Sequence, residues 1–181
     1  ASDVYKRQED HLVSTSWDTT MRIWRLDARR TISTLNVKLA TYATSVSPDG
    51  STIVRGRIGG LDFLDVTTGE PVRDAYVGPD VFGAAISPDG SALAMCQNGR
   101  LRLLDLETNE LIEQIAGSEH HGTIVWSPDG RTVCCAIGTA VVFVDAAGEL
   151  LERIEVPRSF AAAWSPDCLL YTSPSPRDRS L

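Results

Sequence analysis

The most regular candidates for chemistry in this sequence are four aspartates in Ser-Pro-Asp segments: Asp49, Asp89, Asp129 and Asp167. Carboxylates can bind calcium or act in acid catalysis. The first three are followed by glycine, and Pro-Asp-Gly is a turn sequence: proline presets φ, aspartate bonds back to the backbone and glycine accepts positive φ. Because the four aspartates fall on successive repeats, they cannot form one site, and we assign them to turns.

Histidines and cysteines are the other residues that could bind a metal or carry out catalysis. His120 and His121 are adjacent in an expected connecting loop, where a solvated role is more common than ligation. Cys96, Cys134 and Cys135 show no Cys-x-x-Cys or Cys/His metal spacing. Neighbouring strand residues point to opposite faces, so Cys134 and Cys135 do not cooperate as ligands, and we expect small buried hydrophobes. Unpaired thiols favour a reducing compartment, and we predict a cytoplasmic location.

Sequence motifs and net charge exclude several function classes. The sequence contains no nucleophile elbow, P-loop, zincin helix or dinucleotide fingerprint. We therefore predict no catalytic, metal-binding or cofactor-binding residue, no cofactor and no enzymatic activity. The net charge is −7, with 17 Lys and Arg against 24 Asp and Glu. Nucleic acids and anionic membranes recruit basic surfaces, so this balance argues against both as partners.

The elements that position these residues follow from a regular repeat in the sequence. Two landmarks keep the same spacing: the serine that opens each Ser-Pro-Asp-Gly segment, and an aspartate that closes an alternating apolar run. The serines are Ser47, Ser87 and Ser127, and the aspartates are Asp65, Asp105 and Asp145. Each unit reads as four short strands separated by turn residues. The sequence therefore predicts an all-β fold, a partial β-propeller of about four four-stranded antiparallel blades with a repeat of ~40 residues. The expected blade units are 9–37, 42–77, 81–117, 121–156 and 159–167.

The first unit resembles a WD40 repeat. Its segment LVSTSWDTTMRIWRLD, Leu12 to Asp27, places Ser16, Asp18 and Trp24 where that family has three members of its structural tetrad. The later units depart from the pattern, since Leu64, Leu104 and Val144 stand in the tryptophan position. They look like the degenerate, Ser-Pro-Asp-Gly-rich arrays of bacterial WD40-like proteins.

The resemblance implies a non-catalytic protein–protein interaction scaffold, a fragment of a larger WD40-repeat protein. Such arrays often form the C-terminal part of bacterial signalling proteins. In the family, the turn between the second and third strands faces the partner. This position makes Trp17, Arg57, Gln97 and Ile137 the candidate partner-binding residues. The alternative is a propeller enzyme or enzyme-associated propeller, of lactonase or peptidase type, with a site in its central channel.

The two ends of the chain do not continue the repeat. Residues 1–8 and 168–181 resemble translated sequencing-adapter sequence, because DVYKRQ and CLLYTS can be read as one inverted repeat of nucleotides from opposite strands. We therefore expect residues 9–167 to be the native part of the chain, and the two ends to be non-native.

Overall fold

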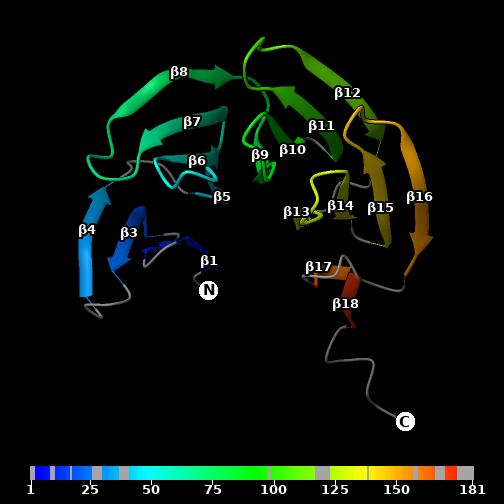
Figure 1. Cartoon of the computed structure of the whole chain (residues 1–181), viewed down its shortest axis with the longest axis horizontal. Coiled ribbons are helices and arrows are strands. Elements are labelled where there is room, and N and C mark those ends of the chain that lie inside the picture. The colour runs from blue at the N-terminus through cyan, green and yellow to red at the C-terminus, as the bar shows by residue number, and fades with distance from the viewer. Residues whose placement is uncertain are drawn as a thin grey trace. The chain divides into compact units, whose positions relative to one another are not determined.

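The computed structural model describes residues 3–8, 11–16, 18–25, 30–36, 41–97, 99–116, 123–137, 139–156, 159–165 and 170–174. These residues form 18 β-strands, and no helix occurs among them. The strands are antiparallel and make four sheets of four strands and one pair (Figure 1). The prediction of an all-β fold with short antiparallel strands is therefore confirmed. Within the described residues no helix is present that is long and apolar enough to cross a membrane.

In each sheet, strands that follow one another along the chain lie side by side. The first sheet has the order β1-β2-β3-β4 and the second β5-β6-β7-β8; the third is β12-β11-β10-β9, the fourth β13-β14-β15-β16, and the pair is β17-β18. The strand bounds are β1 Asp3–Gln8, β2 His11–Thr15, β3 Thr20–Arg25, β4 Arg30–Asn36, β5 Ala43–Val46, β6 Thr52–Arg57, β7 Gly60–Asp65, β8 Pro71–Val77, β9 Val81–Ile86, β10 Ala92–Gln97, β11 Arg100–Asp105, β12 Leu111–Ala116, β13 Ile124–Trp126, β14 Thr132–Ile137, β15 Ala140–Asp145, β16 Leu150–Glu155, β17 Ser159–Trp164 and β18 Leu170–Pro174.

The sequence repeat reappears in the register of the central strand pairs. Val54 lies opposite Phe63 in the second sheet, and the equivalent cross-strand pair recurs in the third and fourth sheets. The recurring pairs are Ala94 with Leu103, and Cys134 with Phe143. Each of the four sheets also has a register irregularity between its last two strands. A bulge of this kind increases the local twist, so the repeats share their distortions as well as their strands.

The Ser-Pro-Asp-Gly segments form the turns that the sequence predicts. In the second sheet, the Gly50 N–H donates to the Ser47 carbonyl at 2.9 Å and Gly50 has a φ of 74°. The Ser47 hydroxyl donates to Asp49, and accepts the Thr52 N–H at 2.9 Å. The same contacts recur around Ser87 and Ser127. Each turn thus satisfies its own polar groups, which explains the repeated residues without a ligand.

The chain divides into two compact units, residues 1–86 and 87–181. In the first unit, buried apolar residues of the β1–β4 sheet pack against those of the β5–β8 sheet. This cluster consists of Val13, Met21, Ile23, Val46, Ile53 and Leu64. In the second unit, residues of β14 and β15 pack against Ala162 on β17, and the Trp164 Nε1 donates to the Val125 carbonyl at 3.3 Å. Apolar faces of neighbouring sheets therefore cover each other within each unit.

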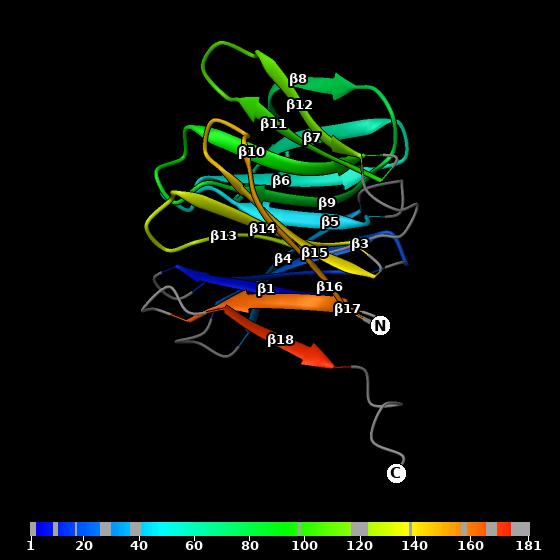
Figure 2. The same ribbon diagram turned by 90° about the vertical axis from the view of Figure 1, so that its right-hand side faces the viewer.

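Two strands fall in the end segments that resemble adapter sequence. Asp3–Gln8 forms β1, which pairs with β2. Leu170–Pro174 forms β18, which pairs with β17 (Figure 2). Strand pairing does not depend on the origin of a sequence, so the adapter origin of these residues stays a prediction.

Candidate partner-binding site

The β6–β7 hairpin carries one of the predicted partner-binding residues, Arg57, at the end of β6. Its turn consists of Ile58 and Gly59, and β7 begins at Gly60. Gly59 has a φ of 81° and Gly60 a φ of 131°, both in the region that favours glycine. A Cβ on Gly60 would lie 1.9 Å from the Tyr76 carbonyl oxygen on β8. The two glycines therefore allow a tight turn that lies directly against the next strand.

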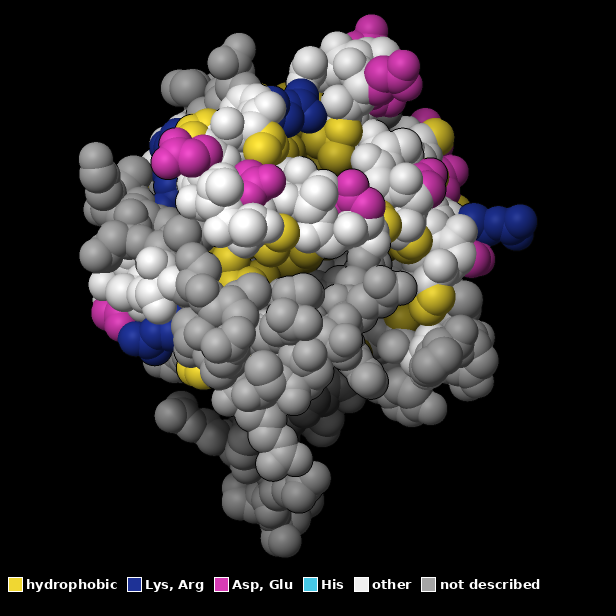
Figure 3. All heavy atoms as spheres, turned by 60° about the vertical axis from the view of Figure 1, so that its left-hand side comes forward, with side chains coloured by type: hydrophobic (Ala, Val, Ile, Leu, Met, Phe, Trp, Pro, Cys, Tyr) yellow, Lys and Arg dark blue, Asp and Glu magenta, His cyan; other side chains and the backbone are white. Residues whose placement is uncertain are grey.

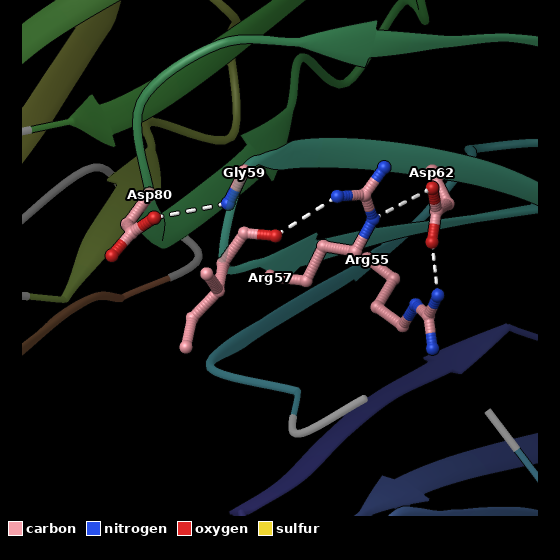
Figure 4. A network of polar contacts seen from close by, with 6 residues as sticks. Arg55, Arg57, Gly59, Asp62 and Asp80 are labelled. Carbon is pink, nitrogen blue, oxygen red and sulfur yellow. Dashed lines mark hydrogen bonds and ion pairs between the residues drawn. The ribbon is translucent and has the colours of Figure 1, made fainter. Parts of the chain in front are cut away.

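A network of charged groups braces this hairpin (Figure 4). Asp62 on β7 accepts hydrogen bonds from the side chains of Arg55 and Arg57, with 2.9 Å between Arg57 Nε and Asp62 Oδ1. Arg57 also donates through Nη1 to the Ile58 carbonyl at 2.9 Å. On the other side of the turn, the Gly59 N–H donates to Asp80 Oδ1 at 2.9 Å. The turn is thus held on one side by Asp62 on β7 and on the other by Asp80, the residue before β9.

The electrostatics of Asp62 keep this network ionised at neutral pH. Partial burial favours the protonated carboxyl, but the hydrogen bonds and positive charges of Arg55 and Arg57 outweigh burial and hold the pKa of Asp62 below its ordinary value. Arg55 itself is buried, with 6% of its surface exposed. An ionised Asp62 between two arginines is therefore a structural element of the hairpin.

The side chain that the hairpin presents is Ile58, not Arg57. Ile58 is 56% exposed at the tip of the turn, whereas the side chain of Arg57 is 16% exposed and lies against Asp62. A single exposed apolar side chain is common on protein surfaces, so the exposure of Ile58 identifies the side chain that the turn offers and does not by itself define a binding surface. Sequence reasoning missed Ile58, although the two glycines that follow it are the signal that places it at a hairpin tip.

Gln97, another of the predicted partner-binding residues, does not present its side chain at the surface. Gln97 is the last residue of β10 and is fully buried, and its Oε1 accepts a hydrogen bond from Arg102 Nη1 at 3.1 Å. Gln97 and Arg102 hold the positions in the third sheet that Arg57 and Asp62 hold in the second, so both sheets have a polar contact there. The two side chains of each pair contact each other across the hairpin because they lie on the same face of adjacent strands. Trp17 and the side chain of Ile137 lie outside the described residues.

The structure shows which groups the tetrad-like residues of the first sheet contact. Trp24 Nε1 donates to the hydroxyl of Ser14 at 2.8 Å, and not to Ser16. Since Trp24 is opposite Leu12 in the β2–β3 register, Ser14 is its diagonal neighbour, and Ser16 lies two residues further along. The Ser16 hydroxyl instead accepts the Asp18 N–H at 3.3 Å.

Asp18 acts within its own turn. It accepts hydrogen bonds from the hydroxyl of Thr20 at 2.6 Å and from the Thr20 N–H at 2.9 Å. These hydrogen bonds hold the pKa of Asp18 below its ordinary value. Asp18 thus caps a β2–β3 turn in the way that Asp49 caps the turn before β6.

Cys96, Cys134 and Cys135, the free cysteines among the described residues, are buried, as the sequence predicts. Burial raises the pKa of the Cys134 thiol to about 12. The interaction with Cys135 lowers the pKa of Cys96, and the same interaction together with burial raises the pKa of Cys135. No cluster of three metal-ligating side chains occurs in the described part of the chain. His120 and His121 lie outside the described residues, and so does Asp167.

The turn aspartates should make the stability of the protein depend on acid pH. Hydrogen bonds from Ser87 and Ser91 lower the pKa of Asp89 from 3.8 to about 2, and similar bonds lower the pKa of Asp49 and Asp129. A carboxyl whose pKa is depressed by folding stabilises the folded state above its unfolded pKa, and this contribution disappears as pH falls through the folded pKa. We therefore expect the free energy of unfolding, measured with urea, to decline between about pH 4 and pH 2.

The variant Asp89→Asn separates this effect from general acid unfolding. Asparagine keeps an oxygen acceptor but does not titrate, so the variant should lose less stability than the wild type between pH 5 and pH 2.5. An equal loss of stability in the wild type and the variant would show that Asp89 does not contribute to the acid dependence of stability.

No family model matches this sequence, and no curated protein matches it. Among solved structures, the chain is similar to a protein described as Kuenenia stuttgartiensis Hydrazine Synthase, with a TM-score of 0.74 and 20% sequence identity. The similarity covers 88% of this chain and 50% of that chain, so this chain spans about half the length of its structural relative. A likeness at this identity shows a shared fold and carries no activity across.

Proposed function

We propose that the four-stranded sheets are blades of a WD40-like β-propeller, and that the chain is part of a non-catalytic scaffold for protein–protein interaction. The sequence repeat, the recurring cross-strand pairs and the apolar packing between neighbouring sheets support the proposal. The similarity to a solved structure over most of this chain shows a shared fold and does not bear on whether the chain is a scaffold or an enzyme. A propeller presents the turns of several blades on one rim, which makes a rigid recognition surface.

The observation that carries the functional part of the proposal is the exposed Ile58 on the braced β6–β7 turn. Arg57, Asp62 and Asp80 fix the turn before any partner arrives, so binding costs little conformational entropy. The partner that fits is a protein with an apolar pocket, because an isoleucine side chain offers no hydrogen bond. On the face shown in Figure 3, Asp and Glu side chains lie among apolar ones, and Lys and Arg side chains are present on the same face. The net charge of −7 favours a protein partner over a nucleic acid.

The alternative, a propeller enzyme, predicts acid or base residues at the starts of the first strands. In the compact unit of residues 1–86, Tyr42 precedes β5 and Phe82 lies near the start of β9. Their rings are 5.1 Å apart in an edge-to-face contact with an interplanar angle of 64°. Aromatic packing at these two positions favours the scaffold.

The variant Ile58→Asp tests the proposed surface. Its control is Val72→Asp, because Val72 is 50% exposed, lies on β8 of the same sheet and is away from the turn. We expect proteins captured from a bacterial lysate by the wild type to be retained by Val72→Asp and lost by Ile58→Asp. Quantitative mass spectrometry of the three captured sets is the measurement. Equal retention by both variants would exclude Ile58 as the contact.

A further inference from the structure

The strand β16 has an edge that pairs with no other strand in the described part of the chain. It is the last strand of the order β13-β14-β15-β16 and lies beyond β15 in Figure 1. All six of its residues are exposed, and three are large and apolar: Leu150 is 52% exposed, Leu151 56% and Ile154 41%. An exposed strand edge is a template for the addition of another strand. The sequence of β16 decides which strand fits.

The hydrogen bonds of β16 show which backbone groups face outward. The Val156 N–H donates to the Thr139 carbonyl at 2.8 Å, toward β15. Because these groups alternate along a strand, those of Ile154 also face β15, and those of Arg153 and Glu155 face away from it. The register irregularity between β15 and β16 lies before residue 152, so residues 152–156 are regular. This regular part can accept a partner strand.

Symmetry and charge together leave one register for a second copy of β16. In an antiparallel pair, opposite residues point to the same face of the sheet. A two-fold axis normal to the sheet must therefore pass between one residue and the same residue of the second copy, so that this residue lies opposite itself. An axis at Glu152, Arg153 or Glu155 would set two like charges opposite each other. An axis at Leu150 or Leu151 would fall on the irregular part of the strand. An axis at Ile154 sets Arg153 of each copy opposite Glu155 of the other.

We propose that β16 pairs antiparallel with β16 of a second copy of this chain, with Ile154 opposite Ile154 at the two-fold axis. The outward N–H and C=O groups of Arg153 and Glu155 then exchange four backbone hydrogen bonds across the axis. Within one copy, Arg153 Nε already lies 2.7 Å from Glu155 Oε1. The two copies therefore join these pairs into a ring of alternating charge. The same charges disfavour strands that lack a complementary pattern.

The interface consists of one short strand from each copy, so the dimer is weak and depends on concentration. It rests on β16 alone and does not depend on the proposed function of the β6–β7 turn.

Charge reversal tests the pairing by sedimentation velocity over a range of protein concentrations. Arg153→Glu sets glutamates opposite each other, and Glu155→Arg sets arginines opposite each other. We expect each variant to reduce the association constant at least about 10-fold. Mixing the two variants should restore dimers, because each Glu then meets an Arg. The double variant Arg153→Glu with Glu155→Arg should also dimerise. Glu110→Arg is the control, since Glu110 is exposed and lies before β12.

Three results would overturn the proposal. The first is a wild-type chain that remains monomeric at the highest concentration measured. The second is a dimer that is unaffected by both single variants. The third is a mixture of the two variants that fails to restore dimers although circular dichroism shows that every variant is folded.

Discussion

Replacing Gly60 with alanine should destabilise the protein by more than about 3 kcal/mol. The added Cβ would lie 1.9 Å from the Tyr76 carbonyl oxygen, a backbone atom of the neighbouring strand that can move only if β7 and β8 separate. The φ of 131° at Gly60 adds strain for any residue with a side chain. Urea unfolding followed by circular dichroism measures the effect.

The control for this prediction is Gly50→Ala. Gly50 has a φ of 74°, but no atom lies within 4 Å of the position that its Cβ would take. Only backbone strain remains there, and we expect a cost of about 1 kcal/mol. If the two alanine variants were equally stable, the close contact of β7 with β8 at Gly60 would be excluded.

Truncation of Trp126 to alanine should cost about 3–5 kcal/mol. Trp126 ends β13, stands directly before a Ser-Pro-Asp-Gly turn and is 9% exposed. Removing a large buried ring leaves a cavity that rigid strands cannot fill. The equivalent position before the turn holds buried apolar residues in two other repeats, Val46 and Ile86. The loss of stability in Trp126→Ala therefore tests whether this position belongs to the core in each repeat.

Leu151→Ala provides the comparison for Trp126, because Leu151 is in the same sheet but 56% exposed. Its truncation should change the free energy of unfolding by less than about 0.5 kcal/mol. A loss below about 1 kcal/mol for Trp126→Ala would contradict the assignment of this position to the core.

The sequence predicted the strands and turns well because their signals are local. The alternating runs that end at Asp65, Asp105 and Asp145 are the strands β7, β11 and β15, which end at these residues. Proline and glycine in the Ser-Pro-Asp-Gly segments restrict the backbone strongly enough to fix the turns between them. These features depend on a few neighbouring residues and on no distant contact.

The candidate site was predicted less well because side-chain direction depends on register. Gln97 and Ile58 are both close to a hairpin turn in the sequence, yet Gln97 is buried and Ile58 is exposed. The hydrogen bond from Trp24 to Ser14 depends on register in the same way, because Ser14 is the diagonal neighbour of Trp24 across the β2–β3 pair and Ser16 lies two residues further along β2. A family motif identifies the residue types of such a network, but the cross-strand register decides which atoms meet.

The most direct test of the repeated fold is a set of cross-strand backbone NOEs measured by NMR. We expect contacts between Val54 and Phe63, and the equivalent contacts in the next two repeats. These later pairs are Ala94 with Leu103 and Cys134 with Phe143. Helical sequential NOEs in these segments, or strand pairs that do not recur at the equivalent positions, would contradict the repeated fold.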